Sequence, residues 1–351
     1  MQIELEGEDV RIAQIQREQE DNLFGLENVV GIGVGRKIKG EEETDEPCLS
    51  VLVAQKVPSD LLDDRDRVPK TCKSIKTDVV EAGEIFAGQQ MRGNGGDIGI
   101  SVPPPTPPPP PLTLREPADE FPPFEEGIGI EALRTRRRPA EGGYSVGHVR
   151  ITAGTIATGA IDQSPFPGIP RRYYLLSNNH VLANSNNARL GDPILQPGPA
   201  DGGRFPRDVI GRLSRFVPIR FGGRPNYVDA AIAEVNFHDL DRSIFWIGVP
   251  RGKARVRPRD IVQKTGRTTS YTTGRVTAVN ASVNVNYGGG RVARFVRQIV
   301  TTNMSAGGDS GSLVLDRDEK AIGLLFAGSS RATILNPIDL VESQLGVRVG
   351  F

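Results

Sequence analysis

A run of prolines between residues 103 and 111 constrains the fold of this chain more than any other feature. Eight of these nine residues are proline and the ninth is Thr106. Proline has a fixed φ and no backbone N–H, so the run excludes helix and central strand and favours a stiff polyproline II spacer. A ligand for SH3 or WW domains is the alternative function. We therefore expect a linker at residues 91–142 with a folded part on each side.

Residues 1–90 have the pattern of a small α/β module. Apolar residues at helical spacing predict a helix over residues 10–23, and apolar runs predict strands at residues 28–35, 48–53 and 74–80. Gly31, Gly33 and Gly35 fall inside the first of these strands without a following Gly-Lys-Ser/Thr, which argues against a phosphate-binding loop. From residue 143 onward, short apolar runs alternate with Gly, Pro, Asn and Asp turns, a spacing that favours an all-β barrel or sandwich.

Composition excludes several classes of partner. Lys and Arg together number 43 and so do Asp and Glu, so no overall charge attracts nucleic acid or an anionic membrane. The first residues are acidic with no apolar signal region, and no apolar run is long enough to span a bilayer. Cys48 and Cys72 are too few for a closed zinc site without nearby histidines. We expect no metal and no other cofactor.

The stretch Gly307-Gly308-Asp309-Ser310-Gly311-Ser312 places a hydroxyl nucleophile in a glycine-rich turn. Such a turn lets a substrate carbonyl approach backbone N–H groups, although Gly, Asp and Ser also make ordinary surface turns. A serine nucleophile needs an adjacent base, most often a histidine oriented by a carboxylate. Of the three histidines, His180 alone follows an apolar strand, Tyr173 to Ser177, while His148 and His238 have no motif around them.

A carboxylate for this histidine stands at the entrance of another apolar run, Val228-Asp229-Ala230-Ala231-Ile232. Burying Asp229 is costly unless a group such as a histidine N–H bonds it. The order His180, Asp229, Ser310 is one of the few chain orders in which a Ser-His-Asp triad recurs. The three motifs together are far more specific than any one of them.

With these motifs the chain, from about residue 143 to its end, resembles the chymotrypsin-like (trypsin-like) serine peptidases, in particular intracellular bacterial members without disulfides. The resemblance implies a double β-barrel with barrels at about 143–245 and 255–351. It implies His180 as general base and acid, Asp229 as its orienting group and Ser310 as nucleophile. It also implies an oxyanion hole made by the backbone N–H groups of Gly308 and Ser310.

The family's spacing also implies a substrate pocket with its base near Met304 and Ser305 and its far wall near Phe326, Ala327 and Gly328. None of these side chains is charged, so we expect cleavage after apolar or small residues. Two features depart from the family. The residues before His180 are unusually polar, and no activation peptide precedes Gly143 whose new N-terminal amine would engage Asp309.

The resemblance implies an intracellular serine endopeptidase acting on protein or peptide substrates. Secreted relatives rely on disulfides, and the peptidase-like region here has no cysteine, so we expect a cytoplasmic protein. Because such an enzyme needs control, we expect residues 1 to about 90 to dock near the cleft and restrain it, with residues 112–142 open to cleavage. Two alternatives remain: an inactive peptide-binding or scaffold protein of the same fold, and a chain whose N-terminal module is the functional binder.

Overall fold

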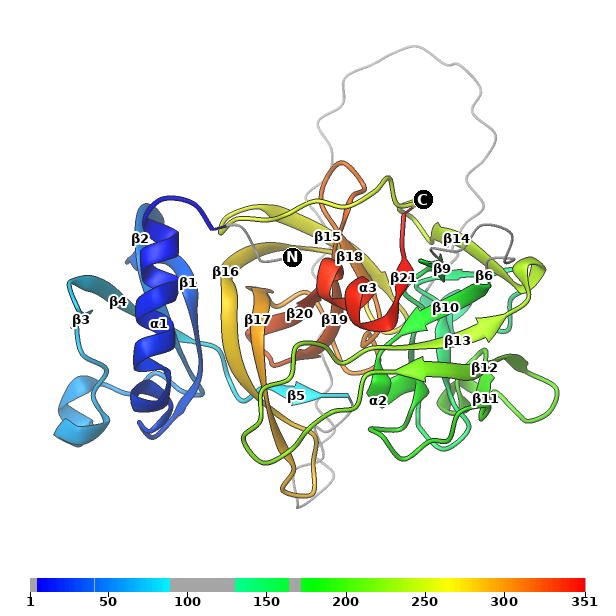
Figure 1. Ribbon diagram of the computed structural model, residues 1–351, viewed down its shortest axis with the longest axis horizontal. Helices are drawn as coiled ribbons and strands as arrows, with labels where there is room; N and C mark the ends of the chain where they lie inside the picture. The colour runs from blue at the N-terminus through cyan, green and yellow to red at the C-terminus, as the bar shows by residue number, and fades with distance from the viewer. Residues whose placement is uncertain (1–4, 41, 89–129, 164–171, 351) are drawn as a thin grey trace, which may run out of the picture.

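The computed structural model describes residues 5–40, 42–88, 130–163 and 172–350 (Figure 1). The proline tract and most of the expected linker lie outside the described residues. The described chain is mainly β, with one large sheet of 11 strands, a second of 8 strands and a small one of 2. No helix within these ranges is long and apolar enough to cross a membrane.

The N-terminal part has one helix packed on a small group of strands. The predicted helix is α1 (Glu8–Phe24), whose buried Ile12 and Ile15 face β1 and β2. The three predicted strands are β1 (Val29–Lys39), β2 (Glu42–Val53) and β4 (Ile75–Glu81), joined by the short strand β3 (Thr71–Cys72) and the 3-10 turns η1 (Ser59–Leu61) and η2 (Asp64–Asp66). A short strand, β5 (Phe86–Ala87), follows.

This N-terminal part continues the sheet of the C-terminal region. β1 pairs antiparallel with β16 (Ser270–Asn286), with Gly31 opposite Val283 and Gly35 opposite Ala278. One hydrophobic core extends across the junction, from Ile12 of α1 and Ile32 of β1 to Val276 of β16. The two regions therefore share a sheet and a core.

The large sheet contains a closed ring of strands. The strand order of the sheet is β15-β18-β19-β20-β17-β16-β1-β2-β4-β3, with β5 paired beside it to β16 and β19. Because β15 also pairs with β16, the first six strands of this order form a closed ring. The members not yet given are β15 (Ile261–Gly266), β17 (Val292–Thr302), β18 (Leu313–Leu315), β19 (Ala321–Gly328) and β20 (Ala332–Pro337). The helix α3 (Ile338–Leu345) directly follows β20.

The second sheet lies on the other side of the molecule (Figure 1). Its order is β21-β9-β10-β13-β12-β11-β7-β8. The strands are β7 (Ser145–His148), β8 (Gly154–Thr155), β9 (Gly159–Asp162), β10 (Tyr173–Ser177), β11 (Pro193–Leu195), β12 (Val209–Phe216), β13 (Ala231–Val235) and β21 (Val347–Arg348), with η4 (Pro199–Asp201) and η5 (Phe237–Asp239) in its loops. The helix α2 (Asn179–Leu182) directly follows β10.

The far end of the expected linker is folded against this second sheet. The turn η3 (Ile130–Arg134) buries Leu133 in the core of the sheet, and β6 (Ala140–Gly142) pairs with β14 (Leu240–Ile244). The arginines that follow η3 are ion-paired, Arg136 with Asp208 and Arg137 with Glu141.

Candidate active site

His180 stands in the first turn of α2, where the buried strand β10 ends. The polar residues before it, which depart from the family pattern, are buried and hydrogen-bonded. Ser177 donates its hydroxyl to the Thr155 carbonyl at 2.8 Å, and Asn178 donates its side-chain amide to the Asp229 carbonyl at 2.7 Å. These bonds fix the end of β10 to its neighbours, so the local polarity holds the histidine in place.

Asp229 precedes β13 and is fully buried against His180. Its Oδ2 lies 2.7 Å from His180 Nδ1, and its Oδ1 accepts the His180 backbone N–H at 3.2 Å. A carboxylate only accepts hydrogen bonds, so Nδ1 carries the proton and Nε2 of the neutral ring is the free acceptor. Among the described residues Nε2 is buried and has no hydrogen-bond partner.

Tyr287 is a third member of this cluster, and nothing in the sequence near His180 or Asp229 points to it. It stands just after β16, and its hydroxyl donates to Asp229 Oδ2 at 2.6 Å. Its ring meets that of His180 edge to face, with centroids 6.2 Å apart. Burial raises the pKa of Tyr287 well above its usual value, and the Asp229 charge adds to the effect. The hydroxyl therefore stays a donor and helps to compensate the buried carboxylate.

Ser310 lies in the loop between β17 and β18, at the junction of the two large sheets. Its carbonyl accepts the N–H of Thr155 from β8 at 2.8 Å, and the Thr155 hydroxyl donates to the Gly308 carbonyl at 2.8 Å. Gly311 has φ +99°, and an added Cβ would lie 2.1 Å from the Ser177 hydroxyl. No other residue fits this turn, which packs the nucleophile loop on the end of β10.

The two expected oxyanion donors keep their N–H groups free. No hydrogen bond among the described residues uses the backbone N–H of Gly308 or of Ser310. The neighbouring N–H groups are bonded instead: Asp309 donates to the Ala306 carbonyl at 3.0 Å, Gly311 to the Leu325 carbonyl at 2.8 Å and Ser312 to the Asp309 carbonyl at 3.0 Å. Both N–H groups are therefore without a hydrogen bond in the described part of the chain, a state that oxyanion donors need before a substrate binds.

His180 and Ser310 meet at one cavity of about 190 Å³. Tyr287 and Arg291 line it from the large sheet, and residues 151–153 line it from the second sheet. The structure therefore brings the three residues proposed from the sequence near one another: His180 bonds Asp229 directly, and His180 and Ser310 line the same cavity. No hydrogen bond joins His180 Nε2 to Ser310 in the described part of the chain.

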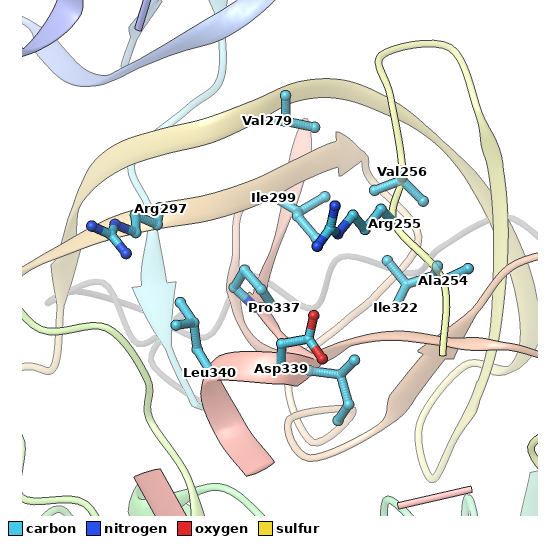
Figure 2. Close-up of a pocket in the computed structure, with 11 residues that line it drawn as sticks. Ala254, Arg255, Val256, Val279, Arg297, Ile299, Ile322, Pro337, Asp339 and Leu340 are labelled. Carbon is cyan, nitrogen blue, oxygen red and sulfur yellow. The ribbon is translucent and has the colours of Figure 1, made fainter. Parts of the chain in front are cut away.

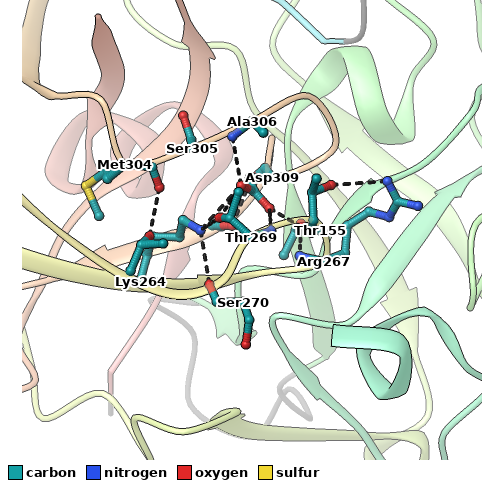
Figure 3. A network of polar contacts seen from close by, with 12 residues as sticks. Thr155, Lys264, Arg267, Thr269, Ser270, Met304, Ser305, Ala306 and Asp309 are labelled. Atoms are coloured by element: carbon teal, nitrogen blue, oxygen red, sulfur yellow. Dashed lines mark hydrogen bonds and ion pairs between the residues drawn. The ribbon is translucent and has the colours of Figure 1, made fainter. Parts of the chain in front are cut away.

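Asp309 is the centre of a buried polar network (Figure 3). Lys264 of β15, also fully buried, places its Nζ 3.3 Å from Asp309 Oδ2. The same carboxylate accepts the hydroxyl of Thr269 at 2.6 Å and the backbone N–H groups of Thr268 and Ala306 at 2.9 and 3.0 Å. Burial lowers the pKa of Lys264, and the Asp309 charge opposes that shift. An ammonium group thus meets Asp309 without any cleavage of the chain.

The five residues expected to form the substrate pocket are spread over several environments. Met304 packs in the core that joins the N-terminal part to the large sheet, whereas Phe326 and Ala327 belong to another core. Ser305 and Gly328 lie close together, because a Cβ on Gly328 would be 3.4 Å from the Ser305 hydroxyl. That hydroxyl lies 2.8 Å from the hydroxyl of Thr333.

A separate small cavity of about 40 Å³ opens where α3 begins (Figure 2). Apolar side chains such as Val279 and Ile299 line most of it, with Asp339 and Arg297 at its edge. It shares no lining residue with the cavity of His180 and Ser310.

Residues 168–324 match the family model described as a trypsin-like peptidase domain. Glutamyl endopeptidase 2 of Streptomyces griseus is 40% identical over 94 residues, which are 25% of this chain and 46% of that enzyme. The chain thus matches about half the length of this curated relative.

Solved structures of bacterial serine proteases are similar to part of the chain. Thermobifida fusca protease A has 17% identity and a TM-score of 0.43, and covers 60% of this chain with 97% of its own. A serine protease specific for glutamic acid, whose structure is described as using a histidine triad in substrate binding, has 22% identity and a TM-score of 0.42, and covers 60% of this chain with 100% of its own.

Proposed function

We propose that the chain is a serine endopeptidase acting through His180, Asp229 and Ser310, from the premise that residues 168–324 match a trypsin-like peptidase domain. One observation supports the triad above all. Asp229 fixes the proton of His180 on Nδ1, which leaves Nε2 as a free acceptor at the cavity that Ser310 lines. A base in this state is what a serine nucleophile requires.

In this mechanism His180 Nε2 removes the proton of the Ser310 hydroxyl as Oγ attacks the peptide carbonyl. The N–H groups of Gly308 and Ser310 stabilise the negative charge that develops on the carbonyl oxygen. His180 then gives the proton to the leaving amine, and an acyl-enzyme remains on Ser310. A water molecule, deprotonated by His180, hydrolyses this ester and restores the hydroxyl. Asp229 and Tyr287 hold the ring and offset its charge.

Ser310→Ala tests this function. Loss of the nucleophile is expected to reduce kcat for a peptide ester by at least about 1,000-fold while leaving the thermal unfolding midpoint unchanged. Ser214→Ala, on β12 outside the cavity, is the matched control and should keep full activity. Equal turnover by the purified Ser310→Ala and wild-type proteins would contradict the assignment.

We also propose a preference for cleavage after apolar or small residues. The Streptomyces griseus relative is named a glutamyl endopeptidase, but none of the five expected pocket residues carries a positive charge to pair with a glutamate. A buried substrate ammonium would lack its partner at these five residues, and the cation that lines the cavity of His180 and Ser310, Arg291, stands outside this set. Digestion of a peptide library separates the cases: cuts after Ala, Val or Leu fit the proposal, and dominant cuts after Glu, Arg or Lys would refute it.

Three finer points complete the proposal. The peptidase region is built from two barrels, at about 143–245 and 255–351, with β1–β4 added to the sheet of the second and β21 to that of the first. The enzyme works in the cytoplasm, which fits the free, buried thiols of Cys48 and Cys72. The region of residues 1–90 controls access to the cleft.

A further inference from the structure

Residues 82–88, here called the β5 segment, connect the N-terminal part to the cavity of His180 and Ser310. After β4 the chain enters the core of the large sheet, where Ala82, Ile85 and Ala87 are buried beside Phe326. The Ser329 hydroxyl donates to the Ala82 carbonyl, and Asn286 donates its backbone N–H to the Ile85 carbonyl at 2.9 Å. In Figure 1 β5 runs from the N-terminal part toward α2, the helix that carries His180.

The β5 segment occupies the edge of β19 that leads to the nucleophile. β19 is tied to the Ser310 loop by two backbone hydrogen bonds, from Gly311 to the Leu325 carbonyl and from Leu325 to the Ser312 carbonyl. β20 covers one edge of β19. On the other edge β18 pairs with residues 321–324 of β19, and β5 pairs antiparallel with the part that follows, with Ala87 opposite Ala327 and Phe86 opposite Gly328.

The β5 segment ends against the catalytic histidine. A Cβ built on Gly88 would lie 3.5 Å from His180 Cδ2 and 3.8 Å from Nε2. Ala87 and Gly88 line the same cavity as His180 and Ser310. Extended peptides commonly bind proteins by adding a strand to a free sheet edge. A peptide that approached Ser310 along β19 would need the edge that β5 already fills.

We propose that the β5 segment is an intramolecular ligand of the catalytic groove, seated where a substrate strand would lie, so that the intact chain is latent. The inference rests on the proposed function, because it takes the cavity of His180 and Ser310 as the reaction site. It assigns the control of substrate access to the seven residues of the β5 segment, which act by pairing with β19. It also fits a preference for small residues, since the occupant presents Ala87 and Gly88 to the site.

Ala87→Asp tests the inference in the full-length protein. A carboxylate at this buried position disfavours the docked strand, so the open fraction and the rate of Ser310 labelling by a fluorophosphonate are expected to rise at least about tenfold. Hydrolysis of a peptide ester should rise in parallel. Glu84→Ala, an exposed change in the same segment, is the matched control and should label at the wild-type rate.

The outcomes separate the inference from the function on which it rests. Equal rates of Ser310 labelling in the wild-type and Ala87→Asp proteins would overturn the inference that the intact chain is latent. The protease assignment would stand. Two folded proteins that both fail to label would remove the assignment, and the inference with it.

A second measurement needs no substitution and so does not depend on how the variant folds. Hydrogen exchange of residues 85–88 is followed in the wild-type protein with and without a tri-alanine boronate, which binds an active serine. Displacement of the β5 segment predicts faster exchange of these amides once the boronate is bound. Unchanged exchange in protein whose Ser310 is shown by mass spectrometry to carry the boronate would overturn the inference.

Discussion

Lys264 shows at the residue scale how one buried charge organises the nucleophile loop. Its ammonium and the Asp309 carboxylate are both fully buried, and the carboxylate has four further donors. Lys264→Met leaves Asp309 charged and without its cation, which is expected to cost about 3–5 kcal/mol of unfolding free energy. Urea denaturation measures this cost. Lys320→Met, whose ion pair with Asp318 is exposed on both sides, should cost about 1 kcal/mol or less.

The double variant Lys264→Met with Asp309→Asn removes both charges and should recover part of the lost stability. The reason is that most of the cost of Lys264→Met comes from the unpaired buried carboxylate, which the double variant no longer has. Full stability of Lys264→Met alone would show that Asp309 does not need the lysine.

Tyr287 gives a residue-scale prediction that depends on pH. Its pKa in the folded protein is raised by burial and by Asp229, whereas an unfolded tyrosine titrates at about pH 10. The neutral hydroxyl therefore contributes stability in full below about pH 10, and the contribution is lost as the pH rises toward the folded pKa. Tyr287→Phe should cost about 1.5–3 kcal/mol at pH 8 and lose stability less steeply above pH 10.

Urea denaturation of both proteins between pH 8 and 11 tests this point, and parallel curves over the alkaline range would contradict it. Tyr271→Phe, which removes an exposed hydroxyl that donates to Gln263, is the control, and its stability should follow that of the wild-type protein over this pH range.

At the scale of elements, α1 is part of the protein's main core. Ile12 is fully buried and shares its cluster with strands of both the N-terminal part and the large sheet. Ile12→Ala should therefore lower the free energy of unfolding of the whole chain by about 2–5 kcal/mol, measured by thermal or urea denaturation. Val10→Ala, on the exposed side of the same helix, should change it by less than about 0.5 kcal/mol. Equal effects of the two changes would contradict the shared core.

Strands were predicted correctly where their own apolar pattern marks them. They were not predicted where hydrogen bonds to distant segments set the bounds of the strand. The sequence pattern of residues 149–161 predicts a single strand, but the structure has two short strands there, β8 and β9. The reason is that its backbone bonds go to different partners: Thr155 donates to Ser310, Ile156 to Tyr144 and Ala157 to Leu176. β20, which pairs with β17 and β19, was not predicted.

At the scale of the whole molecule, the sequence predicts the residues of the candidate site better than it predicts how the segments pack together. The motifs around His180, Asp229 and Ser310 locate the candidate site because each residue needs a particular local environment. Tyr287, Lys264 and Ala87 reach that site through contacts between segments far apart in the chain. No local pattern encodes such contacts. The pairing of β1 with β16 is hidden from the sequence for the same reason.

Labelling with a fluorophosphonate, followed by peptide mass spectrometry, tests the central claim most directly. A serine activated by His180 and Asp229 reacts with this reagent, whereas ordinary serines do not. We predict a single covalent adduct on Ser310, formed slowly in the wild-type protein and faster in Ala87→Asp, and absent from Ser310→Ala and after heat denaturation. Failure of Ser310 to be labelled in folded wild-type and Ala87→Asp proteins, or an adduct on another serine, would contradict the account.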